Sequence, residues 1–98
     1  MVHVALLLDP ADIVATLLSD CQKHDTISLK GSERTLRAED SIPAGHKIAV
    51  SPVREGDDII KYGQKIGIAT ADISPGEWVH LHNMKSAYDA DFKKRIEQ

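Results

Sequence analysis

The spacing of glycines in the middle of the chain limits the fold more than any other feature of the sequence. Between residues 42 and 83, short runs of branched aliphatic residues alternate with turns that contain Gly45, Gly56, Gly63 and Gly76. Reversals roughly every ten residues are typical of small barrels and clips built from short strands. A chain of 98 residues forms a single domain with a modest core. We therefore expect a mainly β fold.

Apolar runs bounded by turn residues predict the strands. The expected strands are residues 2–8, 26–30, 35–38, 46–50, 59–62, 66–69 and 77–82. The first is apolar enough to be buried on both faces. Two turn openings are alike, Ile-Pro-Ala-Gly at residues 42–45 and Ile-Ser-Pro-Gly at residues 73–76, and each precedes a strand that carries histidine. This similarity indicates two pseudo-symmetric halves.

Two short helices are expected at the ends of the chain. Asp9-Pro10 is a typical helix start, and the apolar residues 13, 14, 17, 18 and 21 follow at helical spacing. This predicts an N-terminal helix that ends near Gln22, with Cys21 packed in the core. Beyond a domain of residues 1–83, the pattern of residues 86–96 predicts a C-terminal helical tail within residues 84–98. The tail either folds back on the domain or docks on another chain, such as a second copy in a homo-oligomer.

Composition excludes several classes of function. The net charge of −3 leaves no basic footprint for nucleic acid. The apolar run at residues 2–8 has no basic leader and is far shorter than the roughly 20 residues of a membrane span. A single cysteine cannot form an internal disulfide and fits a reducing compartment. We expect a cytoplasmic protein that binds neither nucleic acid nor membrane.

His80 and His82 are the first candidates for a functional site. They lie two residues apart on a predicted strand, so both imidazoles would project from one face and hold a metal or an anionic substrate. The alternative is an exposed strand face with ordinary surface histidines. Asn83 follows directly, and it either offers an amide to a ligand or simply ends the strand.

The other candidates follow turns. His46 and Lys47 come after the turn at residues 42–45, and since neighbouring strand residues point in opposite directions, at most one should face a given pocket. Tyr62 precedes Gly63 and is either a proton donor or a half-buried strand aromatic. For Lys61 beside it, a functional role and an ordinary strand position are likewise both considered. Trp78 is expected in the core or at an interface.

The order of these blocks resembles the SAF-type N-terminal domain of the altronate and galactarate dehydratases. The matching blocks are residues 42–49, 56–63, 66–73 and 76–83. This domain also occurs as a separate small subunit of such enzymes and of sulfolactate sulfo-lyase. The family's early Asp-Asn-Val-Ala pattern appears here as Asp12-Ile13-Val14-Ala15, without the asparagine.

The resemblance implies a β-clip fold and the small subunit of a sugar-acid dehydratase. The reaction would remove a proton next to a carboxylate and release a β-hydroxyl group. A separate large catalytic subunit would hold most ligands of a divalent metal such as iron. Alternatives are a sulfo-lyase subunit that releases sulfite, and a non-catalytic ligand-binding or assembly module. The implied roles are catalysis by His46, His80 and His82, a metal on His80 and His82, and binding of the sugar acid by Lys47, Tyr62 and Asn83.

Overall fold

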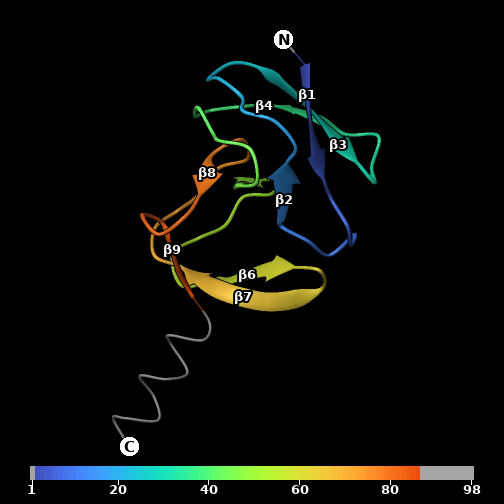
Figure 1. Ribbon diagram of the computed structural model, residues 1–98. Coiled ribbons are helices and arrows are strands. Elements are labelled where there is room, and N and C mark those ends of the chain that lie inside the picture. Colours follow the sequence, from blue (N-terminus) through green and yellow to red (C-terminus); the bar gives the residue numbers. More distant parts are fainter. Residues whose placement is uncertain (1, 87–98) are drawn as a thin grey trace, which may run out of the picture.

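The computed structural model describes residues 2–86, which form short strands and no helix. Figure 1 shows a curled arrangement of two sheets, with the β6–β7 hairpin lying below the start of β2. The strands are β1 (Val2–Leu6), β2 (Val14–Leu17), β3 (Thr26–Lys30), β4 (Thr35–Arg37), β5 (Lys47–Ala49), β6 (Asp58–Lys61), β7 (Gln64–Ala69), β8 (Trp78–Val79) and β9 (Met84–Ser86). The prediction of a mainly β fold is confirmed.

The larger sheet has the strand order β4-β3-β1-β2-β5-β8, and the smaller sheet has the order β6-β7-β9. Neighbouring strands are antiparallel except β1 and β3, which are parallel. A backbone bond from the Ile13 N–H to the Ile60 carbonyl (3.0 Å) ties the start of β2 to β6 in the smaller sheet.

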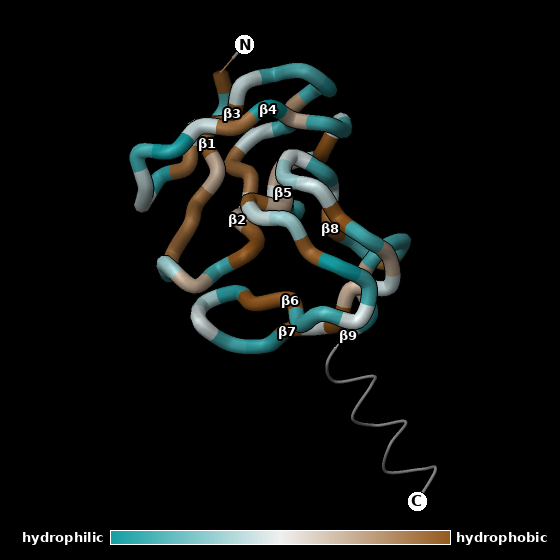
Figure 2. The backbone as a smooth tube through the Cα atoms, turned by 180° about the vertical axis from the view of Figure 1, so that it is seen from behind, coloured by the Kyte–Doolittle hydropathy of each residue, from teal (hydrophilic) through white to brown (hydrophobic). Residues whose placement is uncertain are grey.

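Apolar side chains form two small cores on the two sides of β2 and β5. Ala15 and Leu17 of β2 and Ile48 of β5 belong to the first core, whereas Val14 of β2 and Ala49 of β5 belong to the second. Because side chains alternate along a strand, both faces of these strands are buried. Figure 2 accordingly shows hydrophobic residues along β2 and hydrophilic ones in the outer loops.

Tight turns of one kind occur four times within residues 2–86. Each begins just after a residue of an isolated bridge, and the bridges join the turns in pairs, Cys21 with Ile42 and Val53 with Ile73. Each turn has one residue in the left-handed region, where glycine is least strained. These residues are His24 (φ 81°), Gly45 (82°), Gly56 (91°) and Gly76 (93°). The predicted similarity of residues 42–45 and 73–76 is thus part of a fourfold pattern.

The predicted N-terminal helix is wrong. Asp9 does accept the Ala11 N–H (2.8 Å), but only a turn follows, and residues 14–17 form β2. The apolar spacing suggested a helix because β2 lies between two cores. Apolar residues therefore occur on both faces of the strand, without the alternation of a half-buried strand, and their spacing resembles that of an amphipathic helix. Cys21 does pack in the core, as expected.

Other predicted boundaries change as well. The strand expected at residues 77–82 ends at Val79, and Tyr62 lies in the β6–β7 turn with φ 55° rather than in a strand. β1 buries Ala5, but Val2 at its start is 66% exposed, so it is not covered on both faces.

The predicted C-terminal helix cannot begin at residue 84, because β9 occupies residues 84–86. The rest of that prediction, at residues 87–98, lies outside the described residues. Within residues 2–86, the structure has no helix that could cross a bilayer.

Candidate functional site

Trp78 is the centre of a cluster that holds the three predicted histidines. Its backbone N–H donates to the Asp40 carboxylate (2.9 Å), and its ring packs against the first core. The ring contacts all three imidazoles, at centroid distances of 5.4 Å to His46, 5.6 Å to His80 and 5.7 Å to His82. We call these four residues the histidine–tryptophan cluster.

The rings differ in how they meet. His80 stacks nearly parallel to the indole, at 16°, whereas His46 and His82 meet it edge-on at 78° and 64°. His46 and His80 also contact each other, with centroids 5.0 Å apart. The indole N–H of Trp78 donates to His46 Nδ1 (3.3 Å), so the proton of a neutral His46 lies on Nε2. His46 therefore presents an N–H donor on its other ring nitrogen.

The turn before His46 explains why its ring is available. In the other three turns of this kind, the equivalent residue is an acid whose carboxylate accepts the N–H of the first turn residue. These pairs are Asp25 with Gln22, Asp57 with Arg54, and Glu77 with Ser74. Pro43 occupies the first position of the remaining turn and has no N–H to donate. Hence the side chain of residue 46 has no turn N–H to accept, and a histidine at this position can contact the cluster instead.

Asn83 holds His80 in place through a turn. Its side-chain oxygen accepts the His80 backbone N–H (2.9 Å), and its Nδ2 donates to the Trp78 carbonyl (2.8 Å). Asn83 is only 7% exposed. Since this turn replaces the end of the predicted strand, His80 and His82 converge on Trp78 rather than projecting from one strand face. Both the oxygen and the nitrogen of the Asn83 amide are therefore bonded to backbone groups of this turn.

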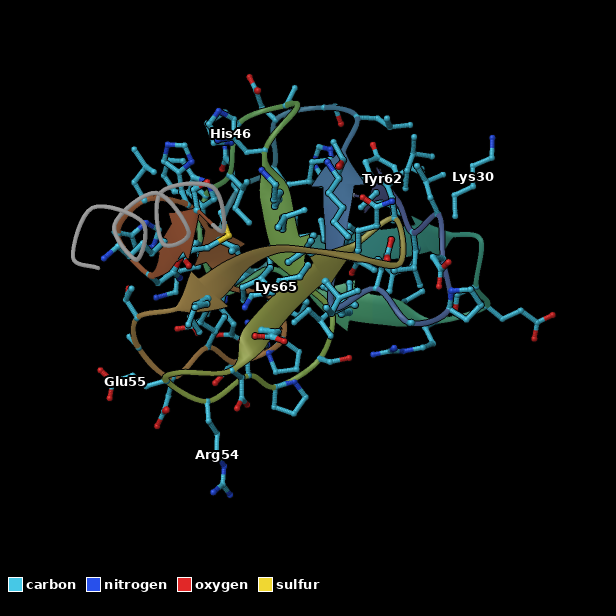
Figure 3. The ribbon with its side chains drawn as sticks, turned by 90° about the horizontal axis from the view of Figure 1, so that it is seen from below. Lys30, His46, Arg54, Glu55, Tyr62 and Lys65 are labelled. Atoms are coloured by element: carbon cyan, nitrogen blue, oxygen red, sulfur yellow. The ribbon has the colours of Figure 1, made fainter. Side chains whose placement is uncertain are left out.

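Lys47 and Tyr62 lie apart from the cluster. Lys47 pairs with Val79 of the second core and so points away from the face that His46 and Ile48 share. Figure 3 shows His46 and Tyr62 well separated when the molecule is seen from below. The Lys61 ammonium lies 4.7 Å from the centre of the Tyr62 ring. The structure therefore places Lys47 and Tyr62 outside the histidine–tryptophan cluster.

The histidines alone do not fit a metal centre. Metals in proteins usually have three or four protein ligands, and in the part of the chain that the structure describes no three His, Cys, Asp or Glu side chains are grouped to hold one. The His80 and His82 rings each contact Trp78. A metal on these histidines would need further ligands from outside residues 2–86.

A second polar network joins β1 to the first tight turn. His3 Nε2 lies 3.0 Å from the Asp25 carboxylate and its Nδ1 lies 2.8 Å from the Ser19 hydroxyl, beside a hollow of about 210 Å³. The backbone N–H of Gln22, followed by His3, holds the pKa of Asp25 below its usual range. Burial raises the pKa of the neighbouring Cys21 thiol, which argues against a reactive cysteine.

Sequence reasoning missed two features of the site. It treated Trp78 only as core or interface, although Trp78 carries the contacts that gather the histidines. It did not identify Asp40, whose carboxylate anchors Trp78 across a separation of 38 residues. A comparison of the four turn sequences would have singled out His46, because its turn begins with a proline, Pro43, which has no N–H for an acid to accept.

Comparison with known proteins agrees with the resemblance. Residues 3–87 match the family model described as the altronate/galactarate dehydratase SAF domain. An altronate dehydratase from Bacillus subtilis is 43% identical over 75 residues, which are 76% of this chain and 15% of that protein. One from Escherichia coli is 39% identical over 75 residues, with the same coverage.

A smaller relative also matches. The (2R)-sulfolactate sulfo-lyase subunit alpha of Paracoccus pantotrophus is 38% identical over 60 residues, which are 61% of this chain and 90% of that subunit. The chain therefore spans about 15% of the length of the altronate dehydratases it matches, but most of the length of a lyase subunit.

Proposed function

Because the chain belongs to the altronate/galactarate dehydratase SAF domain family, we propose that it supplies one wall of a sugar-acid dehydratase active site. The observation that carries the proposal is the gathering of His46, His80 and His82 around Trp78. Elimination of water next to a carboxylate needs one group to take the α-proton and another to protonate the leaving hydroxyl. Imidazoles near neutral pH suit both tasks.

The geometry suggests how the roles are divided. His46 keeps its proton on Nε2 through the Trp78 bond, so it serves as a hydrogen-bond donor to a substrate oxygen. His80 is held by its backbone and by stacking, and among the described residues its ring nitrogens have no hydrogen-bond partner. It is therefore the better proton acceptor. His82 is exposed and completes the rim.

The remaining parts of the site belong to a large catalytic polypeptide. This view is supported by the altronate dehydratases, in which the matched segment is only 15% of the protein. Leu81, between the two histidines, is 75% exposed and offers an apolar contact at the edge of the cluster. Any divalent metal, such as iron, would be held mainly by that partner.

A sulfo-lyase subunit is the second candidate. It is favoured by the match to 90% of a sulfolactate sulfo-lyase subunit, which is a short chain by itself. The same histidines would then assist departure of sulfite in place of water. The two functions differ in leaving group and not in the part that this chain plays.

The test is reconstitution with a large dehydratase-type subunit, followed by assays for dehydration of altronate and galactarate and for sulfite release from sulfolactate. His80→Ala and His46→Ala should lower kcat by about a hundredfold to ten-thousandfold, the range for loss of an acid or base. His24→Asn is the matched control, because His24 is exposed, and asparagine tolerates its left-handed backbone conformation.

The outcomes separate catalysis from scaffolding. Full activity of the His46 and His80 variants in an assembled complex would reject a catalytic role and leave a non-catalytic assembly module. Failure of the chain to bind any large subunit, or to change its turnover, would reject the proposal altogether.

A further inference from the structure

Ser19, His3 and Asp25 form a chain of hydrogen bonds that the proposed dehydratase role does not use. The Ser19 hydroxyl lies 2.8 Å from His3 Nδ1, and His3 Nε2 lies 3.0 Å from the Asp25 carboxylate. The same carboxylate accepts the Gln22 N–H (2.9 Å) and is thereby fixed in the first tight turn. A serine, a histidine and an aspartate are thus connected in that order, although they come from three places in the sequence.

Strand register explains how the serine meets the histidine. Ala5 of β1 pairs with Leu17 of β2. Continuing this antiparallel register by two residues places His3 opposite Ser19. His3 also shares the inward face of β1 with Ala5, a member of the first core, and its side chain is only 10% exposed. The fold therefore holds the imidazole between its two partners, while Ser19 is open to solvent.

The order of donors and acceptors suits activation of the serine. The ionised Asp25 carboxylate only accepts hydrogen bonds, so the proton of a neutral His3 lies on Nε2. Nδ1 is then an acceptor and receives the hydrogen bond of the Ser19 hydroxyl. A serine bonded to an imidazole that a carboxylate orients is the arrangement of an activated nucleophile. The two ring nitrogens have exchanged partners relative to the serine proteases.

The surroundings of Ser19 offer both hydrogen-bond donors and space. Within residues 2–86, the backbone N–H groups of Ser19 and Asp20 have no hydrogen-bond partner. N–H groups at and beside a nucleophilic serine are suitable donors to the oxyanion of a tetrahedral intermediate. The hollow of about 210 Å³ is lined by His3, Asp20, Gln22 and Asp25. It is smaller than a typical drug-sized pocket, and its two carboxylates disfavour anions, so it suits a small uncharged molecule.

We propose that Ser19 is a nucleophile, activated by His3 and Asp25, that cleaves small uncharged carboxylic esters. The Ser19 oxygen bonds to the ester carbonyl carbon as its proton passes to His3 Nδ1. The tetrahedral intermediate then breaks its bond to the alcohol oxygen, which takes that proton from His3 and leaves. A water molecule attacks the acyl-serine in the same way, releases the acid and restores Ser19. None of these residues belongs to the histidine–tryptophan cluster, so the site is independent of the proposed function.

Labelling of the whole chain with a fluorophosphonate tests the nucleophile, because the Ser19 oxygen displaces fluoride and forms a stable bond to phosphorus. Intact mass and peptide mapping should show one label, on Ser19, that is absent from Ser19→Ala and from urea-unfolded protein. Ser74→Ala is the matched control, because Ser74 is an exposed serine of another tight turn, and this variant should keep the label. No label, or a label on another residue in place of Ser19, would overturn the inference.

Hydrolysis of o-nitrophenyl acetate measures the activity. His3→Gln should lower the rate about a hundredfold, the lower end of the range for loss of a general base, and urea unfolding followed by Trp78 fluorescence checks that the variant is folded. A carboxylated, anionic analogue of this ester should react more slowly, because the carboxylates of Asp20 and Asp25 repel it. Equal rates for the two esters would reject the assigned substrate class. Equal rates for wild type and Ser19→Ala would show that other imidazoles perform the hydrolysis and would refute the site.

Discussion

Replacing Asn83 by alanine tests whether this residue positions the cluster or meets the ligand. The substitution removes two hydrogen bonds, one from the His80 N–H and one to the Trp78 carbonyl, at a position that is 7% exposed. At about 0.5–1.5 kcal/mol for each bond, the free energy of unfolding should fall by about 1–3 kcal/mol. The same loss should lower kcat of the reconstituted enzyme, because His80 is no longer fixed over Trp78.

Urea unfolding followed by Trp78 fluorescence measures the loss, since this tryptophan is the only one in the chain. Thermal unfolding should show a drop of about 4–8 °C for each kcal/mol in a domain of this size. Leu81→Ala is the control, because this side chain is 75% exposed and should change stability by less than about 0.5 kcal/mol. Unchanged stability of Asn83→Ala together with a raised KM would refute the positioning role and restore Asn83 as a ligand contact.

Two further predictions concern the tight turns. Gly76→Ala should lower the free energy of unfolding in urea far more than Gly45→Ala, although both glycines have φ above 80°. A Cβ at residue 76 would lie 2.2 Å from the Arg37 carbonyl oxygen, whereas residue 45 faces open space. Equal losses of stability would contradict the turn packing. Asp25→Asn should remove part of the acid sensitivity of unfolding. The pKa of Asp25 is lowered in the folded state, so its carboxylate stabilises the fold above the usual pKa, and this stabilisation is lost as the pH falls through the lowered value. An identical pH profile for wild type and variant would count against this assignment.

The strands and turns around the glycines were predictable because their signals are local. Residues 26–30 form β3 as predicted and the predicted strand at residues 66–69 lies within β7, while Gly31 and Gly63 mark the turns beside them. The N-terminal helix was mispredicted because β2 is buried between two cores, and its pattern depends on contacts with β5 and β6 that the local sequence does not show.

The three histidines that the sequence singled out lie together in the structure, but their arrangement was not predicted. His46, His80 and His82 do come together, although they are not aligned along a strand face. The turn made by Asn83 decides this, and an asparagine after a strand is compatible with several conformations.

The histidine–tryptophan cluster forms where the chain departs from its own repeated pattern. Three tight turns use an acid to cap the first turn amide, and this occupies the side chain that follows the left-handed residue. At Pro43 the amide is missing, so His46 is released to accept the indole N–H of Trp78. Restoring the pattern with Pro43→Ser and His46→Asp should therefore keep the fold and abolish the cluster. The acid at residue 46 would accept the N–H of residue 43, as in the other three turns, while the proposed His46 donor is lost. The double variant therefore separates the contribution of this position to the fold from its contribution to the chemistry.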